Sequence, residues 1–195
     1  MSGIHLARRV VVGGLLSAGL LALGYAAWVV TDEKVYQAAE RRRFESERVR
    51  ERAGAGRALA PVEGKSIGEI EIPRLGLAAM VVHGESEAIL RRAVAHLPET
   101  ALPGERGNVV LAGHRDTFFR SLKDVRAGDA ITLRTRTADF AYVVESTAVV
   151  SPSDIHVLEP TGGHTLTLIT CFPFTYVGPA PDRFVVRARE IAGPG

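Results

Sequence analysis

The chain contains a single cysteine, Cys171, at the end of an apolar run that reads TLTLITC over residues 165–171. The residues that follow, FPF, predict that the strand opens into a loop at this point. A thiol in that position is held by the strand and exposed by the loop, which favours nucleophilic chemistry, whereas an inert buried cysteine is the alternative. With one thiol, an internal disulfide and a zinc site that needs two thiolates are both excluded.

An attacking thiolate needs a base or a cation close by, and two residues fit that need. His114 ends the apolar run NVVLAGH (108–114) and leads into a polar turn, so it could face Cys171 across a sheet. Arg183 opens the last predicted strand, where its guanidinium could donate hydrogen bonds to an oxyanion. A capping histidine and a surface Arg–carboxylate pair are the alternatives. His5 lies in the N-terminal flank, and the remaining histidines are expected to be surface or hydrogen-bonding residues: His83, His96, His156 and His164.

Length and composition predict one main globular domain. The chain has 195 residues, of which 46% are apolar and 24% charged, and these values argue against general disorder. The formal net charge of +2 arises in the N-terminal third, since residues 61–195 contain 14 basic and 16 acidic side chains. Nucleic acid is therefore not an expected partner. The acidic residues are scattered and form no EF-hand loop, so we expect neither a metal nor a cofactor.

The run from Val10 to Val30 contains no charged residue. A helix of that length spans about 30 Å, the thickness of the hydrocarbon core of a membrane. Tyr25 and Trp28 lie near its far end, where aromatic rings favour the membrane interface. We predict a transmembrane signal-anchor at 10–30 after a cytoplasmic flank at 1–9, with a cleaved signal peptide or a soluble helix as the alternatives. More lysines and arginines follow the run than precede it, so charge alone does not decide the orientation.

Residues 31–60 are rich in charged helix formers and contain no proline. Their apolar residues are too sparse for the seam of a coiled coil. We interpret this segment as a solvated helical stalk or linker that lifts the following domain off the membrane. Contact of its membrane-proximal turns with anionic lipid head groups is the alternative.

From residue 61 onward, short apolar runs are separated by glycine and proline. Seven of these runs predict strands: 67–72, 77–83, 108–114, 130–137, 140–150, 165–171 and 183–190. One helix is predicted at 86–97, with Ser86 as its N-cap, and a second short one at 117–124. This number of strands with so few helices predicts an all-β domain, either a closed barrel or a sandwich.

Three segments in order resemble the bacterial sortases, most nearly those of class D. They read LAGHRDTFFRSL (111–122), TLTLITCFPFTYVGPAP (165–181) and DRFVVRA (182–188). The resemblance spans residues 61–190, and it implies a closed eight-stranded β-barrel with one or two short helices. It also implies that residues 61–195 form a catalytic domain on the extracytoplasmic side of the cell membrane, anchored by a single N-terminal transmembrane helix.

Sortases cleave a sorting signal of the LPxTG kind after its threonine, and class D relatives favour LPxTA. The resemblance implies that Cys171 is the nucleophile that forms the thioacyl intermediate. His114 would be the general acid and then the base, and Arg183 would hold the substrate or its oxyanion. Thr170 and Asp116, in the same motifs, are the expected substrate-binding residues. The implied partners are secreted proteins with a C-terminal sorting signal and an amine acceptor such as a peptidoglycan precursor or a pilin lysine.

Two other functions stay open: an endopeptidase that uses water as the acceptor, and a non-catalytic barrel that binds extended peptides. A binding module has no need of a cysteine, a histidine and an arginine together. Residues 97–101 of the chain themselves read LPETA, formally an LPxTA string. Because no apolar segment and basic tail follow it, we expect a proline-containing loop, with inhibitory self-docking as the alternative.

Overall fold

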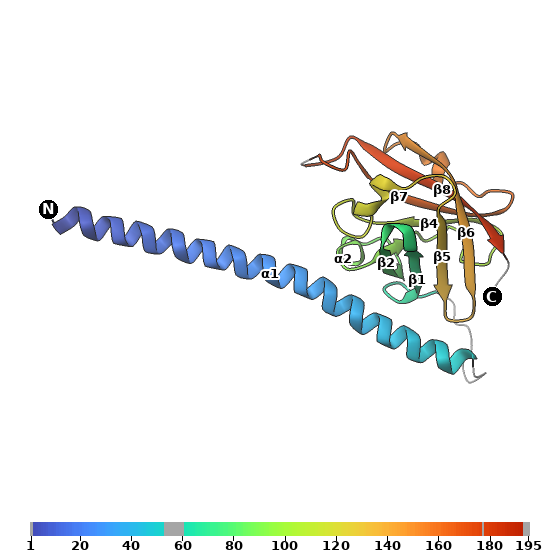
Figure 1. Cartoon of the computed structure of the whole chain (residues 1–195), viewed down its shortest axis with the longest axis horizontal. Coiled ribbons are helices and arrows are strands. Elements are labelled where there is room, and N and C mark those ends of the chain that lie inside the picture. The colour runs from blue at the N-terminus through green and yellow to red at the C-terminus, as the bar shows by residue number, and fades with distance from the viewer. Residues whose placement is uncertain (1, 53–60, 177, 193–195) are drawn as a thin grey trace. The chain divides into compact units, whose positions relative to one another are not determined.

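The computed structural model describes residues 2–52, 61–176 and 178–192, and the chain divides into two compact units, Met1–Tyr36 and Gln37–Gly195. Helix α1 (Ser2–Arg52) contributes to both units (Figure 1). In the first unit the side chains of residues 12–26 are exposed. Within the described part of the chain, one helix is long and apolar enough to cross a membrane, and it is α1.

The second unit is built on a closed barrel of eight strands (Figure 1). In chain order the strands are β1 (Ser66–Ile72), β2 (Leu77–His83), β3 (Val94–His96), β4 (Gly107–Ala112), β5 (Ala130–Thr135), β6 (Asp139–Val150), β7 (His164–Phe172) and β8 (Asp182–Ala192). Around the barrel their order is β1-β2-β3-β4-β7-β8-β6-β5. The pairs β2–β3 and β4–β7 are parallel and the other pairs are antiparallel. The predicted fold class, a closed eight-stranded barrel, is confirmed.

The core of the barrel is filled by side chains spaced two residues apart along the strands. Ile70 and Ile72 of β1 and Leu166 and Leu168 of β7 are fully buried. Successive residues of a strand point to opposite faces, so this spacing places each pair on the inner face. The same alternation marked the strands in the sequence, and all seven predicted strands are present.

The prediction of a helix over 86–97 is wrong beyond the first turn. Helix α2 comprises only Glu87–Leu90, and the chain then continues into strand β3. This strand is buried and pairs with β2 on one side and β4 on the other. The apolar residues of 86–97 have helical spacing, but the pairing that closes the barrel here outweighs this local preference. The second predicted helix forms as a short 3-10 helix, η2 (Arg120–Asp124), and two further 3-10 helices are η1 (Pro73–Leu75) and η3 (Ile155–Leu158).

The part of α1 from Gln37 onward packs against the barrel, which corrects the expectation of a solvated stalk. Phe44 is fully buried, and Arg48 donates hydrogen bonds to both carboxylate oxygens of Asp139 at 2.7 Å. The side-chain oxygen of Gln37 accepts a hydrogen bond from the backbone N–H of Met80, at 2.9 Å. Residues 37–52 are therefore part of the folded domain.

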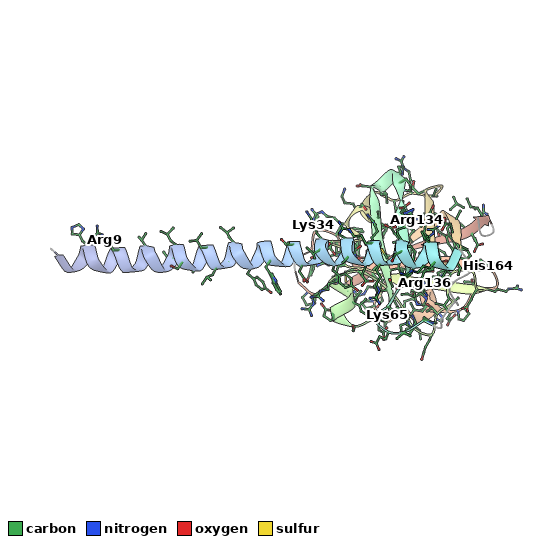
Figure 2. All side chains as sticks on the ribbon, turned by 90° about the horizontal axis from the view of Figure 1, so that it is seen from below. Arg9, Lys34, Lys65, Arg134, Arg136 and His164 are labelled. Carbon is green, nitrogen blue, oxygen red and sulfur yellow. The ribbon has the colours of Figure 1, made fainter. Side chains whose placement is uncertain are left out.

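Charged side chains carry much of this helix–barrel contact. Glu69 of β1 is fully buried, and its carboxylate binds Arg41 of the helix and Arg134 of β5. Arg136 donates to Glu51 of the helix at 3.0 Å; Arg134 and Arg136 are both labelled in Figure 2. Because a buried carboxylate must be paired, these contacts fix the position of the helix segment. A search for apolar periodicity cannot detect an interface of this kind.

Replacing Phe44 with alanine is expected to lower the free energy of unfolding by about 3 kcal/mol, because it leaves a cavity between helix and barrel. Val49 lies on the same helix with its side chain 68% exposed, so Val49→Ala is the matched control and should change stability little. Thermal or chemical unfolding of the full chain measures both variants. Equal stability of the two variants would contradict the packing of residues 37–52 on the barrel.

Two histidines on the paired strands β2 and β3 form a hydrogen-bonded pair. The two Nδ1 atoms of His83 and His96 are 3.0 Å apart, and His96 Nε2 lies 3.0 Å from the carbonyl oxygen of Ala101. Since a carbonyl can only accept, His96 carries its proton on Nε2 and His83 Nδ1–H donates to His96 Nδ1. Burial, together with the charge of His83, lowers the pKa of His96 despite the opposing effects of the hydrogen bond to Ala101 and of Glu105.

This lowered pKa predicts a loss of stability in mild acid. A histidine whose pKa is lower in the folded state binds fewer protons there than in the unfolded chain. Stability is therefore full above the unfolded pKa of about 6.5 and falls as the pH drops from there towards the folded pKa. The slope cannot exceed about 1.4 kcal/mol per pH unit for one proton. Unfolding of the wild type and His96→Gln between pH 8 and pH 5 measures this: the variant should lose that slope, and identical slopes would contradict the prediction.

Candidate active site

Three predicted site residues lie at one end of the barrel, on adjacent strands. β4 and β7 are parallel neighbours, so their carboxyl ends meet, and the antiparallel strand β8 begins at the same end. His114 follows β4 by two residues, Cys171 is the penultimate residue of β7 and Arg183 is the second residue of β8. Cys171 and Arg183 are direct partners in the β7–β8 register. The topology thus brings together residues that are far apart in the sequence.

The turn that carries His114 is fastened to β7 by its backbone. Gly113 donates its N–H to the carbonyl of Ile169 at 3.1 Å, and its own carbonyl accepts the hydroxyl of Thr170 at 2.7 Å. A Cβ atom at Gly113 would lie 2.9 Å from the ring of Phe119, so the close packing of this turn requires glycine. The N–H of Phe119 closes the turn on the carbonyl of His114 at 3.0 Å. These contacts fix the position of the His114 backbone at the end of the barrel.

The two expected substrate-binding residues occupy different environments. Thr170 is 3% exposed and its hydroxyl donates to the carbonyl of Gly113, so this side chain holds the His114 turn. The expected contact of Thr170 with substrate stays a prediction. Asp116 is exposed in the turn that follows His114, and its contact with substrate stays a prediction.

The side chains of the three central residues are partly accessible. Cys171 is a free, half-buried thiol, and the imidazole of His114 is 34% exposed. Arg183 is half-buried, and its Nη1 donates to the carbonyls of Ala180 (3.3 Å) and Asp182 (3.0 Å). Within the residues that the structure describes, no cluster of three or more His, Cys, Asp or Glu side chains is arranged to hold a metal ion. The chemistry available is that of a thiol, an imidazole and a guanidinium.

One acidic side chain near the site was not predicted from the sequence. Glu87 of α2 places its Oε1 atom 3.8 Å from His114 Nε2, with 69% of its side chain exposed. At that exposure its attraction for a protonated imidazole is weakened by solvent. No residue pattern signalled this contact, because Glu87 and His114 are far apart in the chain and meet only in the folded domain.

Aromatic rings pack beside Cys171 and Arg183. Phe172 and Phe184 follow these two residues in the chain, and their ring centroids lie 6.3 Å apart. Phe174 packs edge-on against both rings, at 6.0 Å from Phe172 and 5.3 Å from Phe184. Because side chains alternate along a strand, Phe172 and Phe184 lie on the opposite face of β7 and β8 from Cys171 and Arg183, and Phe174 and Phe184 pack against the barrel core. In the sequence, the only indication of this aromatic cluster was the string FPF that follows the cysteine.

The LPETA string at 97–101 forms an ordered turn between β3 and β4. Leu97 donates its N–H to the carbonyl of Val110 at 3.0 Å, and the Thr100 hydroxyl donates to the carbonyl of Leu97 at 2.7 Å. The Thr100 hydroxyl oxygen also accepts the N–H of Val110 at 3.3 Å, and Ala101 donates to the carbonyl of Asn108 at 3.1 Å. These contacts agree with a proline-containing loop built into the barrel.

Replacing Thr100 with alanine is expected to leave peptide cleavage unchanged and to lower stability by about 1 kcal/mol, because two hydrogen bonds of the turn are lost. Cleavage kinetics and thermal unfolding of the same preparation test both parts. A marked rise in activity would instead support inhibitory self-docking of the 97–101 segment.

Comparisons with known proteins agree with this arrangement. The family model described as "Sortase domain" matches residues 70–191. Sortase D of Bacillus subtilis is 28% identical over 94% of this chain and 99% of its own length. Sortase A of Bacillus anthracis is 32% identical over 54% of this chain and 51% of its own length.

Solved structures show the same likeness. A sortase D5 transpeptidase of Clostridium perfringens superposes with a TM-score of 0.66 at 29% identity, covering 82% of this chain and 98% of that one. Sortase A from Corynebacterium diphtheriae gives a TM-score of 0.62 at 32% identity, over 67% of this chain and 63% of that one. The barrel, the ordered motifs and these similarities agree: the chain belongs to the sortase family of cysteine transpeptidases and is most similar to its class D members.

Proposed function

We propose that this sortase cleaves an LPxTA- or LPxTG-like sorting signal after its threonine and transfers the acyl group to an amine through a thioacyl intermediate on Cys171. The observation that carries the proposal is the direct pairing of Cys171 with Arg183 across β7 and β8, next to the strand end that carries His114. A nucleophile, an oxyanion donor and a proton carrier are the three groups that acyl transfer through a cysteine requires.

In the acylation step, the Cys171 thiolate attacks the carbonyl carbon of the substrate threonine and forms a tetrahedral intermediate. The Arg183 guanidinium donates hydrogen bonds to the oxyanion, for which its planar donor geometry is suited. When the intermediate collapses, the bond to the leaving nitrogen breaks and protonated His114 donates a proton to that amine. The product is a thioester between Cys171 and the threonine carbonyl.

In the transfer step, neutral His114 accepts a proton from the incoming amine as its nitrogen attacks the thioester. The second tetrahedral intermediate expels the Cys171 thiolate, and a new amide bond joins the threonine to the acceptor. Because an amine is a stronger nucleophile than water, the thioester favours transfer to an amine over hydrolysis.

The proposed partners are secreted proteins with a C-terminal sorting signal and an amine of the cell wall or of a pilin. Such substrates reach the enzyme at the outer face of a cell membrane. The length and apolar composition of α1 support a single-pass anchor over residues 10–30 with the catalytic domain on the extracytoplasmic side. Resistance of the full chain to alkaline extraction, combined with digestion of the barrel by external protease in spheroplasts, tests this topology.

The activity is tested with the full chain in detergent and a quenched fluorescent LPETA peptide, with and without an added amine. Turnover that an amine stimulates, with formation of the amide product, supports the transpeptidase. Turnover that is indifferent to the amine would instead identify an endopeptidase. Peptide binding without any turnover would identify a non-catalytic barrel and contradict the proposal.

A further inference from the structure

The guanidinium of Arg115 joins the two loops that carry the site. Its Nη2 atom donates to the carbonyl of Tyr176 at 2.6 Å and to that of Gly178 at 3.0 Å, and its central carbon lies 5.9 Å from the centre of the Tyr176 ring. Arg115 directly follows His114 in the chain, and both carbonyls lie in the segment between Cys171 and Arg183. One side chain therefore connects the His114 turn to the loop that joins β7 and β8.

Apart from Arg115, that loop is supported at its start by Phe174, whose ring packs against Phe172, Phe184 and the barrel core. The β7–β8 ladder ends at the pair Phe172 and Asp182. Beyond it, the described part of the loop is held by a long backbone hydrogen bond from Tyr176 to Pro173 (3.3 Å) and by the bond from Arg183 to Ala180. The side chain of Tyr176 is 46% exposed, so packing adds little at this later part of the loop. The contacts made by Arg115 are the shortest of those that fix the loop.

The hydrogen bonds of Arg115 are concentrated on one nitrogen of its guanidinium. Both carbonyls are bound by Nη2, whereas Nη1 is buried and has no hydrogen-bond partner among the described residues. A buried donor without a partner costs free energy, and the rare examples in folded proteins require an explanation.

We propose that Arg115 is a positioning residue of the transpeptidation, a role that rests on the function proposed above. It keeps the segment after Cys171 against the His114 turn, so that the thiol, the imidazole and the guanidinium of Arg183 stay in register while a substrate carbonyl reacts. Arg115 touches none of the reacting atoms and acts through the loop. Its contribution is orientation, where a misplacement of about 1 Å costs about 100-fold in rate.

The chain offers a matched control for Arg115 at the other ends of the same two strands. Arg106 directly precedes β4 and donates through Nε (2.9 Å) and Nη2 (2.7 Å) to the carbonyl of Gly162, two residues before β7. Both arginines therefore fasten a loop next to β7 by hydrogen bonds to backbone carbonyls. Replacing either one removes the same charge, but only Arg115 lies at the end that carries His114 and Cys171.

The experiment compares Arg115→Met, Arg115→Lys and Arg106→Met in the full chain in detergent. Hydrogen exchange reports the loop between β7 and β8, and LPETA-peptide kinetics with an added amine report kcat and KM. We expect faster exchange of this loop in Arg115→Met, a 10- to 100-fold lower kcat and a KM within about threefold of wild type. Arg115→Lys, which keeps one charged donor group, should recover part of kcat. Arg106→Met should leave both this loop and kcat unchanged.

Unchanged loop exchange or unchanged kcat in Arg115→Met, with an active wild type, would overturn the inference alone. A fall in kcat of equal size in Arg106→Met would also overturn it, because the effect would then be one of general stability. If Arg115→Met fails to fold, Arg115→Lys decides the question by the same two readouts. Absence of turnover in the wild type would contradict the proposed function itself and, with it, the role of Arg115.

Discussion

Replacing Cys171 with alanine is expected to abolish both cleavage and transfer, because the variant has no atom that can form the thioacyl bond. The expected fall in kcat/KM is at least about 10⁴-fold, as for other enzymes that lose their nucleophile. Cys171 is the only cysteine of the chain, so no second thiol can replace it. Cleavage of a quenched LPETA peptide by the full chain in detergent measures the loss.

The control for this variant is its stability. Cys171 is half-buried near the end of β7, and the β7–β8 ladder depends on backbone atoms that alanine keeps. The melting temperature of Cys171→Ala should therefore stay close to that of the wild type. Cleavage retained by a folded Cys171→Ala variant would contradict the thioacyl mechanism.

Arg183→Met is expected to lower kcat/KM by about 100- to 1000-fold, the range found when one donor to an oxyanion is removed. The loss should fall mainly on kcat, because the negative charge on the carbonyl oxygen develops only as the intermediate forms. Arg183→Lys should lie between the wild type and Arg183→Met, since lysine keeps the charge but loses the planar pair of donors. Steady-state kinetics with the same peptide separate the three enzymes.

Arg189 provides the matched control on the same strand. Its side chain is 59% exposed and pairs with Glu145 at 2.8 Å, six residues along β8 from Arg183. Arg189→Met removes an equal charge and should leave kcat/KM unchanged, because a surface ion pair contributes little. Wild-type kinetics in Arg183→Met would contradict the role proposed for this guanidinium.

The barrel and the placement of the central residues were largely predictable from the sequence. Strands with one buried face alternate apolar and polar residues, and the runs around Ile70 and Leu166 showed this pattern clearly. Cys171 and His114 were identifiable because each ends such a strand and leads into a loop. Their approach across β4 and β7 requires the parallel pairing of these strands, which the structure shows and no residue pattern indicated.

Contacts set by tertiary packing were not predictable in this way. Strand β3 is short and follows a helical spacing of apolar residues, so its pairing between β2 and β4 had no local signal. The docking of residues 37–52 relies on the buried carboxylate of Glu69 and on arginines, which look like a solvated surface in a sequence. The contact from Arg115 to the carbonyl of Tyr176 involves a backbone atom, and no residue pattern encodes it.

The intact mass of the enzyme during turnover tests the central claim most directly. The full chain is mixed with an LPETA peptide in the absence of an amine acceptor, quenched in acid and measured by mass spectrometry. The account predicts a wild-type adduct with the mass of the acyl fragment that ends at threonine, located on Cys171 and removed by hydroxylamine. It predicts no adduct on Cys171→Ala. The contradicting result is a wild-type chain that cleaves the peptide and yet stays unmodified. In that case Arg183→Met would accumulate no adduct either.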